Sequence, residues 1–146
     1  MSITNFNNIA LCSSSLLCIL NHTKELELSK AFLIYPIVMH NETLLFLSKK
    51  STKKRKLNSL ILTHPLYFLN FNDRFYSSLA LTLNSIQYLI STNQIFFNHN
   101  LSTNKIVKIN NNHGEKISLI NKASEKIIFL LDQPIEELYL NLRIKL

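Results

Sequence analysis

Apolar residues recur in the first third of the chain at spacings typical of α-helices. The segment Ile9–Leu20 repeats them every three or four positions, which predicts a helix capped near Thr4 or Asn5. The segment Ser29–His40 is apolar on nearly all sides, which predicts a central, buried helix. Pro36 lies inside it and is expected to kink or shorten this helix, because proline lacks the backbone N–H donor.

A run without apolar residues, Ser48–Lys56, then interrupts the pattern. It predicts a solvated loop, and the apolar segment Leu57–His64 behind it predicts a helix that ends before Pro65. Ser51 and Thr52 are the candidate caps of this helix, because their hydroxyls can accept a hydrogen bond from its first turn.

The second half of the chain contains the clearest helical periods. They predict a long helix over Asn72–Asn93, capped by Asn70 or Asn72, and another over Glu115–Leu131. Pro134 is well placed to begin a short last helix that extends to Leu142. The expected buried stripe of the long helix consists of Phe75, Leu79, Thr82, Leu83, Ile86, Leu89 and Ile90.

Between these two helices the period changes to that of strands. We expect a β-hairpin at about residues 94–109, with strands at Ile95–Phe97 and Lys105–Ile109, where apolar and polar residues alternate. The polar segments Asn21–Glu27 and Asn110–Gly114 are expected to be a loop and a turn.

The chain has 146 residues, of which 47% are hydrophobic, so residues 1–146 are expected to form a single domain with its own core. Its only glycine is Gly114, which excludes phosphate-binding and dinucleotide-binding loops that require several glycines. The predicted fold class is mainly α with one β-hairpin. The order of helices and hairpin is that of a winged helix-turn-helix.

The formal net charge is +7, which favours acidic partners such as nucleic acid or an acidic protein surface. Cations gather in the polar run, and two more lie on the second predicted strand. A cluster of this kind can bind phosphates without reading sequence, although it can equally be a solvated loop. The candidate contact residues are Lys49, Lys50, Lys53, Lys54, Arg55, Lys56, Lys105 and Lys108.

Large apolar side chains also occur where they could remain exposed and serve a partner. They lie at Leu66–Leu69, at Phe96 and Phe97, and in the tail Leu138–Leu146. Packing into the core is the alternative for each.

The residues that carry chemistry form no recognisable catalytic or metal-binding pattern. The five histidines lack ligand spacing, and the acidic residues do not pair on a helix face. Cys12 and Cys18 are expected to be reduced core residues, because a six-residue spacing on one helix places them on nearly opposite sides. We therefore expect no catalysis, cofactor, metal or small-molecule substrate. The longest apolar run has nine residues, so a cytoplasmic protein without a membrane partner is expected.

Several blocks, in order, resemble the middle component of three-component ABC ATPase systems. The blocks are AFLIYPIVMH, LSKKST, THP, FNDRFYSSLALTLNSIQYL, NKASEKIIFL and NLRIKL. The positions that match the family's motifs are Pro36, His40, Ser51, Thr52, Pro65, Arg74, Lys122, Ala123, Leu142 and Arg143.

The resemblance implies a non-enzymatic adaptor with a winged helix-turn-helix-like fold. Its partners would be an ABC ATPase subunit and a larger effector subunit encoded nearby, in a bacterial conflict system such as defence against phages, with contact to DNA or RNA as an added role. One alternative is a stand-alone winged helix-turn-helix regulator of DNA, although Leu57–His64 offers only Asn58 and Ser59 for base contacts. Another is a structural scaffold whose charge is incidental.

Overall fold

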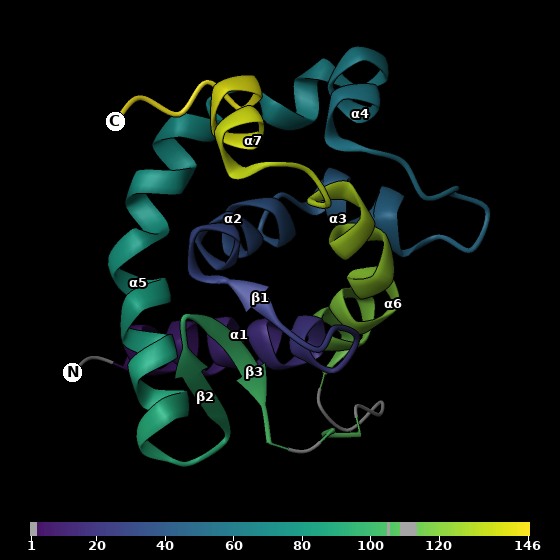
Figure 1. Ribbon diagram of the computed structural model, residues 1–146. Helices are drawn as coiled ribbons and strands as arrows, with labels where there is room; N and C mark the ends of the chain where they lie inside the picture. The colour runs from purple at the N-terminus through teal and green to yellow at the C-terminus, as the bar shows by residue number, and fades with distance from the viewer. Residues whose placement is uncertain (1–2, 105, 109–113) are drawn as a thin grey trace.

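The computed structural model describes residues 3–104, 106–108 and 114–146 (Figure 1). The described part is mainly helical, with a small antiparallel sheet, and forms one compact domain, as the sequence predicts. The winged helix-turn-helix arrangement is not confirmed. In chain order the elements are α1 (Ile3–Leu20), β1 (Leu26–Glu27), α2 (Leu28–Val38), α3 (Asn41–Ser48), α4 (Leu57–Thr63), the 3-10 helix η1 (Pro65–Phe68), α5 (Phe71–Ser91), β2 (Ile95–Asn98), β3 (Asn100–Thr103), α6 (Glu115–Leu130) and α7 (Ile135–Asn141).

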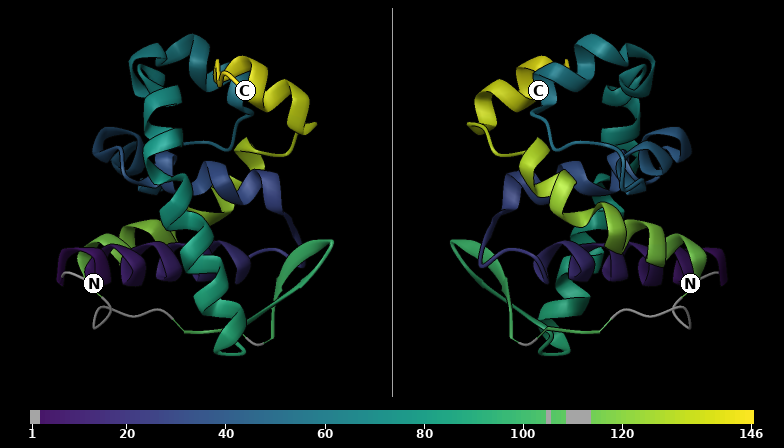
Figure 2. Two further views of the ribbon diagram at one scale, coloured as in Figure 1. Left: turned by 90° about the vertical axis from the view of Figure 1, so that its left-hand side faces the viewer. Right: turned by 90° about the vertical axis from the view of Figure 1, so that its right-hand side faces the viewer.

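Helix α2 lies at the centre, with α1, α5 and α6 around it (Figures 1 and 2). Helix α1 packs against both α5 and α6, while α2 packs against α5 and α3 against α6. From Leu33 to Val38 every side chain of α2 is buried, which explains why that segment is apolar on all sides. Of the described helices, none is by itself both long and apolar enough to cross a membrane.

The expected helix over Ser29–His40 is confirmed as α2, which ends two residues earlier than expected. Helix α2 includes Pro36 and ends at Val38, and α3 then leaves at an angle of 100°. His40 stands between them as the N-cap of α3, where its side chain accepts a hydrogen bond from the backbone N–H of Thr43. The chain thus turns two residues after the proline-containing turn.

The buried stripe of α5 is confirmed in part and is narrower than its apolar residues indicate. Phe75, Thr82, Ile86 and Leu89 are buried, but Leu83 and Ile90 are exposed by 42% and 37%. At about 100° per residue, Leu83 and Ile90 lie at one edge of this stripe. The opposite edge carries Ser78 and Ser85, which are both buried.

The sheet differs from the predicted hairpin in two respects. Its second hairpin strand is β3, at Asn100–Thr103, instead of Lys105–Ile109, because a tight turn at His99 with φ 66° reverses the chain at once. Its third strand is β1, inside the expected loop, and the strand order is β1-β3-β2. Residues 106–108 belong to no regular element and Ile106 is 72% exposed, while Lys105 and residues 109–113 lie outside the described residues.

Non-glycine residues hold left-handed positions in this chain. They are Asn70, Asn93, His99 and Arg143, all with φ near 60°. Asn93 and Arg143 follow the last residues of α5 and α7 and complete two C-terminal caps. In each cap, the N–H of the left-handed residue and the N–H of the next residue donate back to carbonyls of the last turn, for example Ile144 to Tyr139 at 3.1 Å.

Candidate functional site: the basic loop and the arginine node

The basic loop, residues 49–56, connects α3 to α4 and follows the side of α6. Thr52 fixes its shape: the side chain is buried, its hydroxyl donates to the carbonyl of Phe46, and its N–H donates to the carbonyl of Lys49 at 3.1 Å. Thr52 is therefore not a cap of α4, and neither is Ser51, because Lys56 stands at the N-cap without a side-chain bond. The predicted end of this helix before Pro65 is confirmed.

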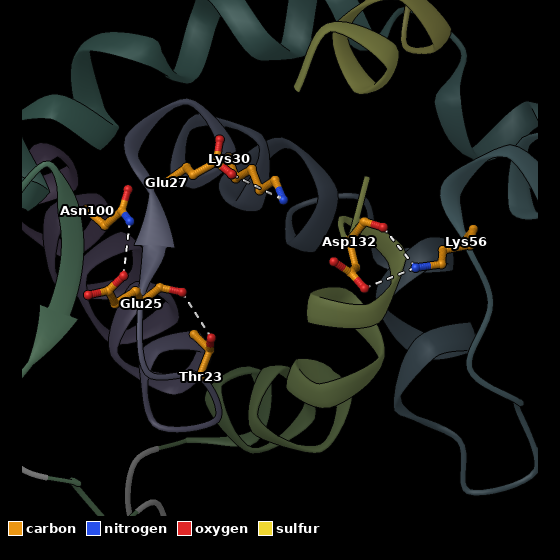
Figure 3. Close-up of polar contacts among 7 residues, drawn as sticks. All are labelled: Thr23, Glu25, Glu27, Lys30, Lys56, Asn100 and Asp132. Atoms are coloured by element: carbon orange, nitrogen blue, oxygen red, sulfur yellow. Dashed lines mark hydrogen bonds and ion pairs between the residues drawn. The ribbon is translucent and has the colours of Figure 1, made fainter. Parts of the chain in front are cut away.

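Three of the six cations in the loop are engaged with other parts of the molecule. Lys56 Nζ binds the carbonyl of Asp132 at 2.8 Å and its carboxylate at 3.1 Å, just beyond the C-terminus of α6 (Figure 3). There a cation complements the negative end of the helix dipole. Lys54 Nζ lies 3.7 Å from Glu125, and the Arg55 guanidinium lies 5.3 Å from the centre of the Phe46 ring. From α6, Lys126 donates back to the loop carbonyl of Lys49.

The other three cations, Lys49, Lys50 and Lys53, are here called the free lysines. Their side chains are exposed, and among the described residues none makes a hydrogen bond or ion pair. The loop therefore presents a fixed backbone with three uncommitted ammonium groups.

Of the two cations predicted on the hairpin, Lys105 lies outside the described residues and Lys108 is exposed beyond the hairpin. The segment of Lys108 is held by Asn21, whose amide donates to the carbonyl of Val107 at 2.7 Å and accepts from its N–H at 3.1 Å. The backbone of Val107 thus bonds to the side chain of Asn21, in place of the neighbouring strand that the alternating pattern of Lys105–Ile109 predicts.

A second polar cluster, the arginine node, surrounds Arg74 near the start of α5. Its Nη1 donates to the carbonyl of Pro36 at 2.9 Å, and its Nη2 donates to the carbonyl of Tyr67 at 2.6 Å. The guanidinium also lies 5.0 Å from the centre of the Phe71 ring. Burial lowers the pKa of Arg74 below its usual range. One side chain thus joins α2, η1 and α5, and it satisfies a carbonyl in the last turn of α2.

His40 and Pro65 adjoin the same node. The His40 ring lies 6.0 Å from the Tyr67 ring, and Pro65 occupies the first position of η1, where its missing N–H costs nothing. Burial, together with the nearby Arg74 charge, lowers the pKa of His40. The neutral imidazole is the form that can accept from the N–H of Thr43 at 3.4 Å.

The sequence itself matches a known family over nearly its whole length. Residues 2–146 match the family described as ABC-three component (ABC-3C) system Middle Component 3. The chain belongs to this family. No curated protein and no solved structure matches it. The family name implies that this middle component associates with other components of a three-component ABC system.

The motif positions of this middle component fall into two groups in the structure. Pro36, His40 and Arg74 meet at the arginine node, and Pro65 begins η1, which supplies the Tyr67 carbonyl of the node. The others are dispersed: Thr52, Ala123 and Leu142 are buried, whereas Ser51, Lys122 and Arg143 are exposed.

Large apolar side chains are exposed at both ends of the molecule. One end, here called the apolar end, is formed by α4, η1, α7 and the C-terminal tail (Figure 1). It exposes Leu62, Leu66, Leu69, Leu140 and Leu146 by 83%, 71%, 62%, 76% and 98%. At the hairpin, Phe96 and Phe97 are about half exposed, at 49% and 51%. In the tail, Leu138, Leu142 and Ile144 are buried instead.

Sequence reasoning missed Leu62, although a signal was present. Leu57 and Leu60 of α4 are buried, and Leu62 lies two positions beyond Leu60, on the opposite side of a helix. Residues 57–72 also contain no Asp, Glu, Lys or Arg, so nothing charged covers these leucines from within the segment.

The thiols and metal-ligating residues offer no reactive centre in the part of the chain described. Cys12 and Cys18 are free and buried, and burial raises the pKa of Cys18 to about 11. Thiols held in the protonated form are poor nucleophiles. No group of three or more His, Cys, Asp or Glu among the described residues is arranged to hold a metal ion.

Proposed function

We propose that this middle component is a non-enzymatic adaptor that links the ABC ATPase of its system to the larger effector subunit. It acts in the cytoplasm in bacterial conflict, such as defence against phages. The carrying observation is the apolar end, where five leucines are more than 60% exposed on one small domain. An exposed apolar cluster of this kind is typical of a protein–protein interface.

A second contact surface, the free lysines, supports the adaptor role. Lys49, Lys50 and Lys53 lie on a loop fixed by Thr52 and by α6, so contact with phosphates would require little ordering of the backbone. We propose that these lysines meet DNA or RNA, or an acidic face of a partner, while the apolar end binds another subunit. Lys108 is a further candidate for the same contact.

The first test is co-expression of the tagged chain with its neighbouring genes. We expect the ATPase and the larger subunit to co-purify with the wild-type chain. The double variant Leu66→Asp, Leu140→Asp should lose at least one of them. Binding would bury the new aspartate charges in an apolar interface, and removing an unpaired charge from water is costly. Both residues are exposed, so the fold should persist.

Phe96→Asp with Phe97→Asp is the matched control, because it places two charges at exposed aromatic positions of the hairpin. It should keep whichever subunit the leucine variant loses. A wild-type chain that purifies alone, as a dimer that shifts one specific duplex, would overturn the adaptor and favour the stand-alone regulator.

A further inference from the structure

A cleft of about 570 Å³ separates the segment around β1 from the C-terminal half of α6 (Figure 3). Its apolar lining includes Leu26 from β1, Ile19 from α1, and Ile127 and Leu131 from α6 and its C-cap. Glu25, Leu26 and Glu27 border it in succession. The cleft is separate from the apolar end and is not used by the arginine node.

The charge of this cleft is opposite to that of the chain. Four of the nine acidic residues of the whole protein line it, against two cations, Lys30 and Lys54, although the net charge of the chain is +7. The acidic residues are Glu25, Glu27, Glu125 and Asp132. They come from two sides, so that a chain laid along the cleft would have carboxylates on both flanks.

Three of these four carboxylates have loosely held partners, whereas Asp132 is bound by Lys56 Nζ at 3.1 Å. Glu27 lies 3.6 Å from Lys30, and Glu125 lies 3.7 Å from Lys54; both carboxylate side chains are more than half exposed. Exposed ion pairs of this kind contribute little stability. Among the described contacts, the carboxylate of Glu25 accepts only from the amide of Asn100, at 3.1 Å, while its backbone carbonyl accepts from the hydroxyl of Thr23. A cation from another molecule could therefore take these places at small cost.

The strand beside the cleft also has an unpaired side. Among the described strands, β1 stands at one edge of the sheet and pairs with β3 alone, through Leu26 opposite Leu101 and Glu27 opposite Asn100. In an antiparallel pair, successive residues direct their N–H and C=O groups to opposite sides, so one of these two residues directs its groups away from β3. Such an edge accepts an extended segment as a further strand.

We propose that this cleft is the docking site for an extended segment rich in lysine or arginine, supplied by another component of the system. The segment pairs with the free side of β1, places its apolar side chains on the floor of the cleft, and directs its cations to Glu25, Glu27 and Glu125. This inference rests on the adaptor role proposed above and specifies the chemistry of one partner.

The probe is a fluorescently labelled peptide of alternating lysine and valine, measured by fluorescence anisotropy with the full chain at about 50 mM salt, where screening is modest. We expect it to bind roughly ten-fold more tightly than the same peptide with glutamine for lysine. General attraction cannot produce this result, because the chain and the lysine peptide are both positive.

The deciding variant is the double substitution Glu25→Gln, Glu125→Gln, which should weaken binding of the lysine peptide roughly ten-fold. Glu42→Gln with Glu115→Gln is the matched control; it removes two carboxylates that do not line the cleft and should leave binding unchanged. Equal weakening of peptide binding by both variants would overturn the proposal.

A lysine peptide methylated at alternate backbone nitrogens tests strand pairing, because methylation removes the N–H donors. If this peptide bound as tightly as the unmethylated one, the pairing with β1 would be wrong.

Two further outcomes separate this inference from the adaptor role. If the wild-type chain retains no other component on co-expression, the adaptor role fails. If the wild-type complex forms and the Glu25→Gln, Glu125→Gln variant retains every component and still binds the peptide, only the cleft proposal fails. A wild-type dimer that this variant dissociates would assign the cleft to a second copy of the chain and would also overturn the proposal.

Discussion

The arginine node and the basic loop use the same kind of side chain in opposite ways. At the node, the two terminal nitrogens of Arg74 donate to carbonyls of α2 and η1, so this cation holds three elements together and has no terminal nitrogen left for a partner. In the loop, Lys56 likewise binds Asp132 beyond the end of α6, and Lys54 makes a weaker pair with Glu125, whereas Lys49, Lys50 and Lys53 make no such contact among the described residues. A cation is available to a partner only where the fold leaves its donors unused.

The largest effect on stability is expected from Arg74→Met. It keeps much of the apolar stem but leaves the carbonyls of Pro36 and Tyr67 without donors, which should lower the free energy of unfolding by about 2–3 kcal/mol. Urea denaturation measures the change. Arg143→Met, at an exposed arginine, is the control and should change stability by less than about 0.5 kcal/mol. Equal effects of the two variants would show that the node is not structural.

A smaller loss is expected within the basic loop itself. Lys56→Met removes two hydrogen bonds to Asp132 from a partly exposed position and should cost about 0.5–1 kcal/mol. Lys50→Met, six residues earlier, should have no measurable cost, because the structure gives its ammonium group no partner among the described residues. Thermal unfolding of the two variants compares them directly. If Lys50→Met lowered the stability as much as Lys56→Met, the distinction between engaged cations and free lysines in the loop would be wrong.

The smallest effect concerns pH at the node. Because the pKa of His40 is lower in the folded chain than its ordinary value of 6.5, the unfolded chain binds the proton first as the pH falls. The stability that this histidine contributes is complete above pH 6.5 and is lost as the pH falls through the lowered pKa. His40→Asn keeps an N-cap side chain without titrating and should flatten the decline in melting temperature on acidification. An unchanged decline in the His40→Asn variant would contradict this role of the histidine.

The sequence could predict the long helices, because their repeated apolar residues lie within one continuous segment. Helices α5 and α6 repeat apolar residues over four or more turns, and both were found within two residues of the expected bounds. Of the sheet, the first hairpin strand was predicted correctly at Ile95–Phe97, whereas β1 and β3 were not, since β1 has two residues and the hairpin turns at His99 alone. Too few residues lie in these strands for alternation to be visible.

The candidate surfaces depended on contacts between residues distant in sequence. The six cations of the basic loop look equivalent along the chain. Lys54 and Lys56 differ from the free lysines only through Glu125 and Asp132, which lie more than 70 positions later. The same limit applies to the acidic cleft. Its carboxylates come from two segments about 100 residues apart, so no spacing in the sequence brings them together.

The left-handed positions at the ends of α5 and α7 also affect the unfolded chain. With asparagine and arginine where many proteins have glycine, the folded backbone bears a local steric cost at these positions. The unfolded chain, however, has fewer conformations to lose on folding than a glycine-rich chain of equal length. The scarcity of glycine therefore reduces the entropic cost of folding while it raises the conformational energy of a few turns. Part of the stability of this domain thus originates in the restricted freedom of its denatured state.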